Sequence, residues 1–190
     1  KKKISAMKTR LINAAGRMKI CLFDKTGTLT TNDVCLDSVL CFDPDVDNQE
    51  CVELQKDSLQ ENPKFIAKNL LRNFATNHTL VNFGSKSDEG SSTRILGDPL
   101  EIELFEFNSA EFCQSKETSG QSSHMKTFKA TIGKERETLG VRQVFSFKSE
   151  LQRMSVIVDC MQIGETYSFV KGAPERILEL SEKSTLPQGI

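Results

Sequence analysis

The chain has 190 residues, and its 25 basic and 26 acidic side chains give a formal net charge of −1. This balance argues against a dedicated nucleic-acid-binding protein, which would carry an excess of positive charge. Because the chain has neither an apolar run of about 18 residues nor an apolar signal segment at its start, we expect a globular stretch that lies in the cytosol.

The cysteines are scattered and do not have the spacing of a zinc site. The chain also has only two histidines that could complete such a site. We therefore predict free thiols, mostly buried, in a reducing compartment. The residues concerned are Cys21, Cys35, Cys41, Cys51, Cys113 and Cys160.

The first predicted strand runs from Met18 to Phe23, a short and mostly apolar stretch that stops at Asp24. A second strand is predicted from Val34 to Phe42, followed by an acidic turn from Asp43 to Asn48. The first strand therefore ends directly before the polar sequence Asp24–Thr30.

Two helices are predicted in the middle of the chain. Asn62-Pro63 is typical of a helix start, and the apolar residues from Phe65 to Phe74 follow at helical spacing. A second helix begins after Asp98, with Pro99 at its first position and Glu101 where a capping-box acid belongs, and it extends to about Phe107. Polar stretches at 84–92 and 114–123 are predicted to be loops.

The last third of the chain predicts three strands and a closing helix. The alternating apolar residues favour strands over Leu139–Phe147, Met154–Met161 and Thr166–Val170. Pro174 then suits the first turn of a helix that ends near Leu180.

The polar sequence after the first strand suits phosphoryl transfer. The carboxylate of Asp24 can act as a nucleophile and form an aspartyl-phosphate. Gly27 lets backbone N–H groups approach phosphate oxygens, while Lys25 adds positive charge and Thr28 adds a hydroxyl donor. A strand followed by an ordinary Asp- and Gly-containing turn is the alternative.

The same residues, Asp24 to Thr30, read DKTGTLT and resemble the phosphorylation signature of P-type ATPases. Three further segments resemble that family in the expected order: the GDPLE segment, the strand pair from Phe147 to Val156, and the KGAPE motif from Lys171 to Glu175. The sequence from Arg10 to Gly16 and the LQRMSV run are similar to the type V subfamily, whose members transport cations or polyamines.

The resemblance implies an α/β (α+β) fold. Residues 1–36 would be the first piece of a haloacid-dehalogenase-like phosphorylation domain, including its first strand. Residues 37–190 would be a nucleotide-binding domain with an antiparallel sheet and flanking helices, incomplete at its C-terminus. The chain would then be a fragment of a longer polypeptide, and the rest of that polypeptide would be its partner.

The resemblance also assigns roles in binding ATP and Mg²⁺. Asp24 would accept the γ-phosphate, and its carboxylate would bind Mg²⁺ together with the Thr26 carbonyl. Lys25, Thr26, Gly27 and Thr28 would hold the phosphate. For the base, Phe147 would stack on adenine, with Lys171, Gly172 and Glu101 around it. Without the family, Phe147 would be a core residue, Lys171 a surface lysine and Glu101 a helix cap.

For the full-length protein we expect an ATP-driven pump of a eukaryotic internal membrane. It would carry a cation or polyamine through membrane helices outside this chain, and the segment would face the cytosol. The basic first residues of the chain suit this position beside a membrane helix.

Two alternatives remain. One is a nucleotide-binding module that is catalytically inactive as isolated. The other is a soluble phosphatase of the haloacid-dehalogenase class, which is disfavoured because Thr26 occupies the place of its second catalytic aspartate.

Overall fold

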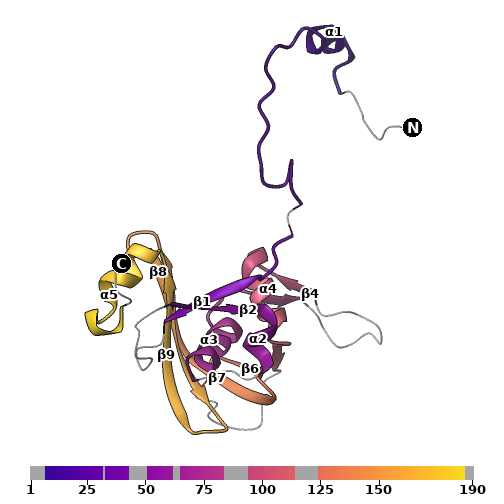
Figure 1. Cartoon of the computed structure of the whole chain (residues 1–190). Coiled ribbons are helices and arrows are strands. Elements are labelled where there is room, and N and C mark those ends of the chain that lie inside the picture. The colour runs from indigo at the N-terminus through magenta and orange to yellow at the C-terminus, as the bar shows by residue number, and fades with distance from the viewer. Residues whose placement is uncertain are drawn as a thin grey trace. The chain divides into compact units, whose positions relative to one another are not determined.

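The computed structural model describes residues 7–31, 33–42, 51–61, 65–83, 94–113 and 124–186. The chain divides into two units, Lys1–Asp33 and Val34–Ile190, each of which is considered by itself (Figure 1). Several features that the sequence predicts lie outside the described residues. They are the polar loops at 84–92 and 114–123, the acidic turn from Asp43 to Asn48 and the Asn62-Pro63 cap.

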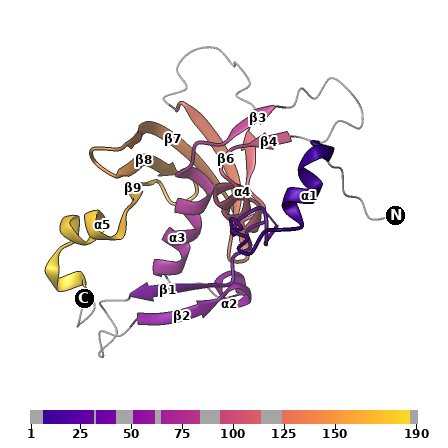
Figure 2. The same ribbon diagram turned by 90° about the horizontal axis from the view of Figure 1, so that it is seen from above.

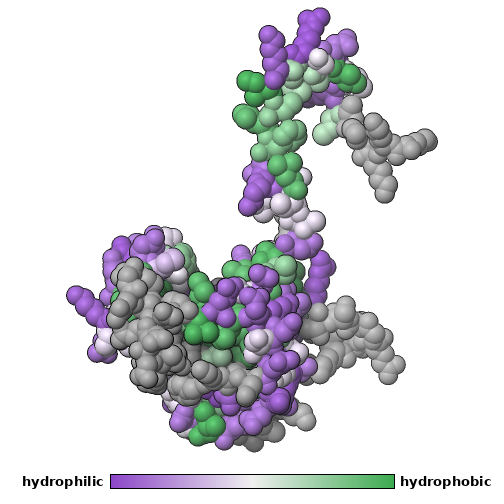
Figure 3. Space-filling model, viewed as in Figure 1, coloured by the Kyte–Doolittle hydropathy of each residue, from purple (hydrophilic) through white to green (hydrophobic). Residues whose placement is uncertain are grey.

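The Lys1–Asp33 unit contains a short 3-10 helix, η1 (Thr9–Leu11), and α1 (Ile12–Ala15). The strand predicted from Met18 to Phe23 is wrong, because this stretch has no regular secondary structure and its apolar side chains are exposed (Figure 3). A strand needs a hydrogen-bonded neighbour, and the described residues of this unit provide none. The apolar pattern therefore marks a segment with strand propensity that pairs with no other described residue of this unit.

The larger unit is organised around an antiparallel five-stranded sheet with the order β5-β6-β7-β8-β9 (Figure 2). The three strands predicted in the last third of the chain are confirmed as β7, β8 and β9, and each has somewhat different bounds. Strands β5 and β6 were not anticipated. The bounds are β5 (Glu111–Cys113), β6 (Lys126–Ile132), β7 (Glu135–Lys148), β8 (Arg153–Cys160) and β9 (Glu165–Gly172).

The predicted helices are found as α3 (Phe65–Thr76), α4 (Pro99–Phe107) and α5 (Pro174–Leu180). Asp98 caps α4 as predicted, since its Oδ1 accepts from the backbone N–H of Leu100 at 2.9 Å. The short helix α2 (Lys56–Glu61) was not anticipated. Within the described ranges no helix is both long and apolar enough to cross a bilayer.

Two small hairpins complete the described part of the larger unit. β1 (Ser38–Phe42) pairs with β2 (Cys51–Gln55), and β3 (Val81–Phe83) pairs with β4 (Arg94–Leu96). The second predicted strand is thus confirmed only in its C-terminal half, β1. The structure as a whole is the mixed α/β fold with an antiparallel sheet that the sequence predicts.

The core lies between one face of the sheet and the helices α3 and α4. Leu71 of α3 and Phe105 of α4 are fully buried there against Phe128, Leu139 and Val156 of the strands. Burying one large apolar side chain contributes about 1.5–3 kcal/mol, so this face is what attaches α4 firmly to the sheet.

Cys21, Cys35, Cys113 and Cys160 are free thiols, but they are not mostly buried. Cys160 is buried in the core, whereas Cys21 and Cys35 are exposed. The burial prediction is wrong for these two because the segments that carry them contribute no side chain to the core.

Candidate nucleotide and phosphorylation sites

The Asp24–Thr30 loop is exposed and closes on the carbonyl oxygen of Lys25. The backbone N–H groups of Leu29 and Thr30 donate to this oxygen at 2.9 and 3.2 Å. Asp24 Oδ1 accepts from the N–H of Lys25 at 2.9 Å, and Gly27 has a φ of 76°, which favours glycine. The loop therefore presents the Asp24 carboxylate on a tight, glycine-dependent turn.

Asp24 and Thr26 offer the oxygen donors that Mg²⁺ prefers. Mg²⁺ is usually bound through one or two protein oxygens, with water and substrate phosphate filling its other positions. A carboxylate and a backbone carbonyl fit such a partial set. The residues that the structure describes contain no cluster of three or more acidic, histidine or cysteine side chains.

Phe147 lies at a β-bulge near the end of β7. Phe145 pairs with Ser155 and Lys148 with Arg153, so Ser146 and Phe147 together face Met154 on β8. The ring of Phe147 is 55% exposed, which contradicts its interpretation as a core residue. An exposed aromatic ring held at a bulge is available to stack on a flat ligand.

Lys171 lies on β9 directly across β8 from this bulge, because it pairs with the same residue, Met154. Neighbouring strands lie about 4.8 Å apart, so the backbones of Phe147 and Lys171 are separated by about 10 Å. Paired residues of an antiparallel sheet point to the same face, and Met154 is buried in the core. Lys171 therefore extends over the face on which α4 packs.

Glu101, in the first turn of α4, meets Lys171 there. Lys171 Nζ lies 2.6 Å from Glu101 Oε1, and the side chains are 36% and 12% exposed. Burial alone would raise the pKa of Glu101, but hydrogen bonds from Lys171 and Thr79 lower it below its ordinary value. The carboxylate is thus ionised at neutral pH, and it has a larger role than a helix cap.

The other oxygen of Glu101 is held by a residue that sequence reasoning missed. Thr79 donates to Glu101 Oε2 with both its backbone N–H, at 2.9 Å, and its hydroxyl, at 2.8 Å. No local pattern indicates this contact, because 22 residues separate Thr79 from Glu101. The two residues meet only when α4 packs beside the end of α3.

Gly172 allows the turn between β7 and β8 to approach the end of β9. A Cβ atom on Gly172 would lie 2.4 Å from the carbonyl oxygen of Gln152 and 2.8 Å from Cβ of Arg153. Gln152 itself has a φ of 50° in that turn. Packing against the turn is therefore sufficient reason for a glycine beside Lys171.

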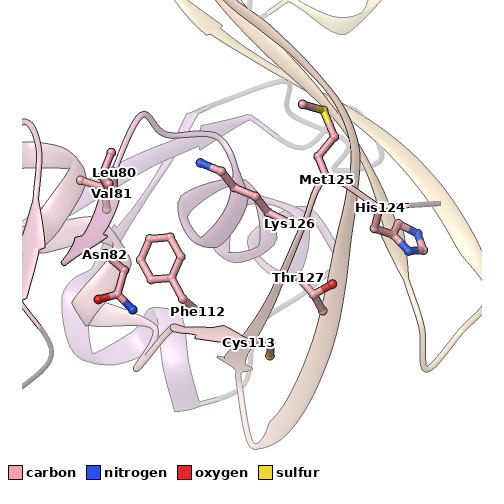
Figure 4. Close-up of a pocket in the computed structure, with 9 residues that line it drawn as sticks. All are labelled: Leu80, Val81, Asn82, Phe112, Cys113, His124, Met125, Lys126 and Thr127. Carbon is pink, nitrogen blue, oxygen red and sulfur yellow. The ribbon is translucent and has the colours of Figure 1, made fainter. Parts of the chain in front are cut away.

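A separate pocket of about 260 Å³ lies between β3, β5 and the start of β6 (Figure 4). Its lining includes neither Phe147 nor Lys171, and Lys126 extends its ammonium group across it in the close-up. The lining residues are Leu80, Val81, Asn82, Phe112, Cys113, His124, Met125, Lys126 and Thr127. The sequence did not predict this pocket.

Comparison with known proteins places the larger unit in one family. Residues 67–188 match the family described as P-type ATPase, cytoplasmic domain N. This match covers most of α3 and all of α4, the five-stranded sheet and α5, and so it includes Glu101, Phe147, Lys171 and Gly172.

Curated relatives match nearly the whole chain. It is 32% identical to the vacuolar cation-transporting ATPase YPK9 of Saccharomyces cerevisiae, over 94% of this chain and 14% of that protein. It is 30% identical to the probable cation-transporting ATPase 13A4 of Homo sapiens, over 98% and 15% respectively. It is also 30% identical to the endoplasmic reticulum transmembrane helix translocase of Schizosaccharomyces pombe, over 87% and 12%. The chain thus spans a small part of the length of these relatives.

Proposed function

Because the chain belongs to the P-type ATPase family, with relatives among the 13A cation-transporting ATPases, we propose that it binds ATP and becomes phosphorylated on Asp24. The observation that carries the nucleotide part is the placement of Phe147 and Lys171 on either side of Met154, with Lys171 joined to Glu101. This arrangement offers one exposed ring and one charged pair to the same ligand.

The nucleotide base stacks on Phe147 in this proposal. The aliphatic stem of Lys171 forms a second apolar wall, and its ammonium group donates to acceptor nitrogens of the base. Glu101 holds that ammonium in place through Oε1. Gly172 contributes only backbone groups next to Lys171, because the turn between β7 and β8 occupies the space where its side chain would lie.

The phosphoryl group is transferred to Asp24. A carboxylate oxygen of Asp24 forms a bond to the γ-phosphorus, the bond to the oxygen that bridges the β- and γ-phosphates breaks, and ADP leaves with that electron pair. The positive charge of Lys25, the Thr28 hydroxyl and the turn around Thr26 and Gly27 orient the phosphate. Mg²⁺, when bound by Asp24 and the Thr26 carbonyl, neutralises phosphate charge.

In domain terms, we assign residues 1–36 to a phosphorylation domain and residues 37–190 to a nucleotide-binding domain. The full-length protein would couple the aspartyl-phosphate to transport of a cation or polyamine across an internal membrane, with this segment in the cytosol. The names of the vacuolar and endoplasmic reticulum relatives support an internal membrane.

An ATP titration of the 190-residue chain, followed by NMR, tests the nucleotide site. We expect shifts at Phe147 and Lys171, and an affinity for ATP that falls in Phe147→Ala by roughly 5- to 150-fold, since stacking on a base is worth about 1–3 kcal/mol. Phe145→Ala is the matched control, because Phe145 is 52% exposed on the same strand but pairs with Ser155 rather than facing Met154. Equal effects of the two substitutions would contradict the assignment.

Labelling of the full-length protein with γ-³²P-ATP tests the phosphorylation step. We expect a label that is stable to acid, is removed by hydroxylamine and is absent from the Asp24→Asn variant. If the chain binds ATP but Asp24→Asn is labelled like the wild type, the nucleotide site stands and Asp24 is not the acceptor. A nucleotide-binding module without catalysis would bind ATP with no labelling at all.

A further inference from the structure

Glu101 uses its two carboxylate oxygens for two different partners. Oε1 accepts from Lys171 Nζ at 2.6 Å, and Oε2 accepts both donors of Thr79. A carboxylate whose second oxygen is held by two donors has little freedom to rotate, so the direction of Oε1 is set by Thr79. Thr79 is itself exposed and belongs to the short connection between α3 and β3.

Thr79 is in turn held by the residues on either side of it. His78 is buried, with ring centroids 5.0 Å from Phe105 and 5.1 Å from Phe128. Its Nδ1 accepts from the backbone N–H of Leu80 at 3.2 Å, so Nε2 carries the proton and donates to the Ala75 carbonyl at 3.2 Å. The imidazole therefore ties the end of α3 to the residue after Thr79.

Burial supports this arrangement electrostatically. It lowers the pKa of His78 to about 4, so the ring is neutral at physiological pH and keeps the acceptor nitrogen that Leu80 needs. The buried ring is rigid because α4 and the sheet surround it. The backbone N–H of Thr79 is consequently directed at Glu101 before any ligand arrives.

We propose that Thr79 is a positioning residue of the nucleotide site: it fixes Glu101, and through Glu101 it fixes the ammonium group of Lys171 toward the base. This inference rests on the proposed nucleotide site but adds a residue outside the motifs that suggested the site. Preorganised polar groups bind a ligand more tightly because less freedom is lost on binding. The hydroxyl of Thr79 is the part of this device that a substitution can remove cleanly.

The test compares Thr79→Val, which removes the hydroxyl and keeps the shape, with Thr79→Ser, which retains it. ATP affinity of the 190-residue chain should fall by about three- to tenfold in Thr79→Val, in keeping with the loss of one charge-assisted hydrogen bond, and should be largely restored in Thr79→Ser. Thr138→Val makes the same chemical change near the start of β7, whereas Phe147 lies near the end of this strand. This variant should leave the affinity for ATP unchanged.

A second readout separates positioning from a general loss of structure. The ionisable groups that face Glu101 are Lys171 on β9 and His78 after α3, while Asp98 at the start of α4 accepts the Glu101 backbone N–H. Removing one donor from Oε2 should raise the pKa of Glu101, observed by carboxyl ¹³C NMR without nucleotide, and should move the acidic limit of ATP binding to higher pH. Thr79→Ser should show neither change.

An unchanged Glu101 pKa together with wild-type ATP affinity in Thr79→Val would overturn the positioning role. Equal weakening by Thr79→Val and Thr79→Ser would overturn it as well, since the hydroxyl would then not be the cause. Failure of the proposed nucleotide site has a different signature: Phe147→Ala binds ATP as the wild type does, whatever Thr79→Val does.

Discussion

Arg72 of α3 and Glu137 of β7 form a buried, two-pronged ion pair. Arg72 Nε donates to Glu137 Oε2 and Arg72 Nη2 donates to Glu137 Oε1, both at 2.8 Å, and the side chains are 4% and 5% exposed. Cys160 also donates from Sγ to Glu137 Oε2 at 3.3 Å. Although burial alone would raise the pKa of Glu137, these donors keep it low. The pair joins α3 to the middle of the sheet.

Removing one member of this pair should destabilise the fold strongly. Glu137→Gln leaves the Arg72 guanidinium buried without its counter-charge, and we expect the free energy of unfolding to fall by about 3–5 kcal/mol in urea denaturation. Replacing both residues by methionine should cost much less. The exposed pair of Arg176 and Glu179 is the control, because Glu179→Gln should change stability by less than about 1 kcal/mol. A small effect of Glu137→Gln would show that water reaches the pair.

Lys171→Met should weaken ATP binding by about tenfold or more, since it removes the ammonium group and keeps the stem. Lys129→Met is the matched control on β6, between the buried residues Phe128 and Ala130 and therefore on the opposite face of the sheet. Isothermal titration calorimetry would measure both. Because Lys171 and Glu101 are in contact, Lys171→Met combined with Glu101→Gln should cost less than the sum of the single substitutions. Strict additivity would argue against a coupled pair.

Gly172→Ala should destabilise the sheet by roughly 1–3 kcal/mol, because the added methyl group meets the Gln152 carbonyl and Arg153 in the adjoining turn. Thermal unfolding of the 190-residue chain would detect the loss. Gly16→Ala provides the comparison, since its φ is −68° and the nearest atom to an added Cβ is 3.7 Å away. If both variants melt at the wild-type temperature, the backbone around Gly172 must be able to yield.

His78 should make stability depend on pH between about 6.5 and 4. Burial lowers its pKa in the folded state to about 4, so below its ordinary pKa of 6.5 the unfolded chain binds the proton more readily than the folded chain. The contribution of His78 to the free energy of unfolding is therefore fully present above pH 6.5. It declines as the pH falls toward 4, by roughly 3 kcal/mol in total.

Urea denaturation at pH 7 and pH 4.5 would measure this dependence. In the His78→Gln variant the difference between the two pH values should shrink by about 2–3 kcal/mol relative to the wild type. His124→Gln, which removes the other histidine of the chain, is the control and should leave the contribution of His78 in place. An undiminished difference in His78→Gln would mean that another group causes the acid sensitivity.

The sequence by itself determined the elements whose signals are local. The Asp98 cap and Pro99 define the start of α4, Pro174 defines the start of α5, and alternating apolar residues predict β7 to β9. The DKTGTLT and KGAPE motifs were sufficient to indicate the P-type ATPase family. These signals depend on neighbours a few residues away, and such patterns can be recognised without knowing the fold.

Only the tertiary structure decided what the polar residues contact. Glu101 reads locally as a capping-box acid, yet its partners are Thr79 and Lys171, 22 and 70 residues away. The bulge that exposes Phe147 likewise depends on its register with β8. The prediction of a strand from Met18 to Phe23 was wrong because a strand needs a hydrogen-bonded neighbour, and the local sequence does not show whether one is present. Hydrogen bonds and ion pairs between distant residues exist only once packing brings the elements together.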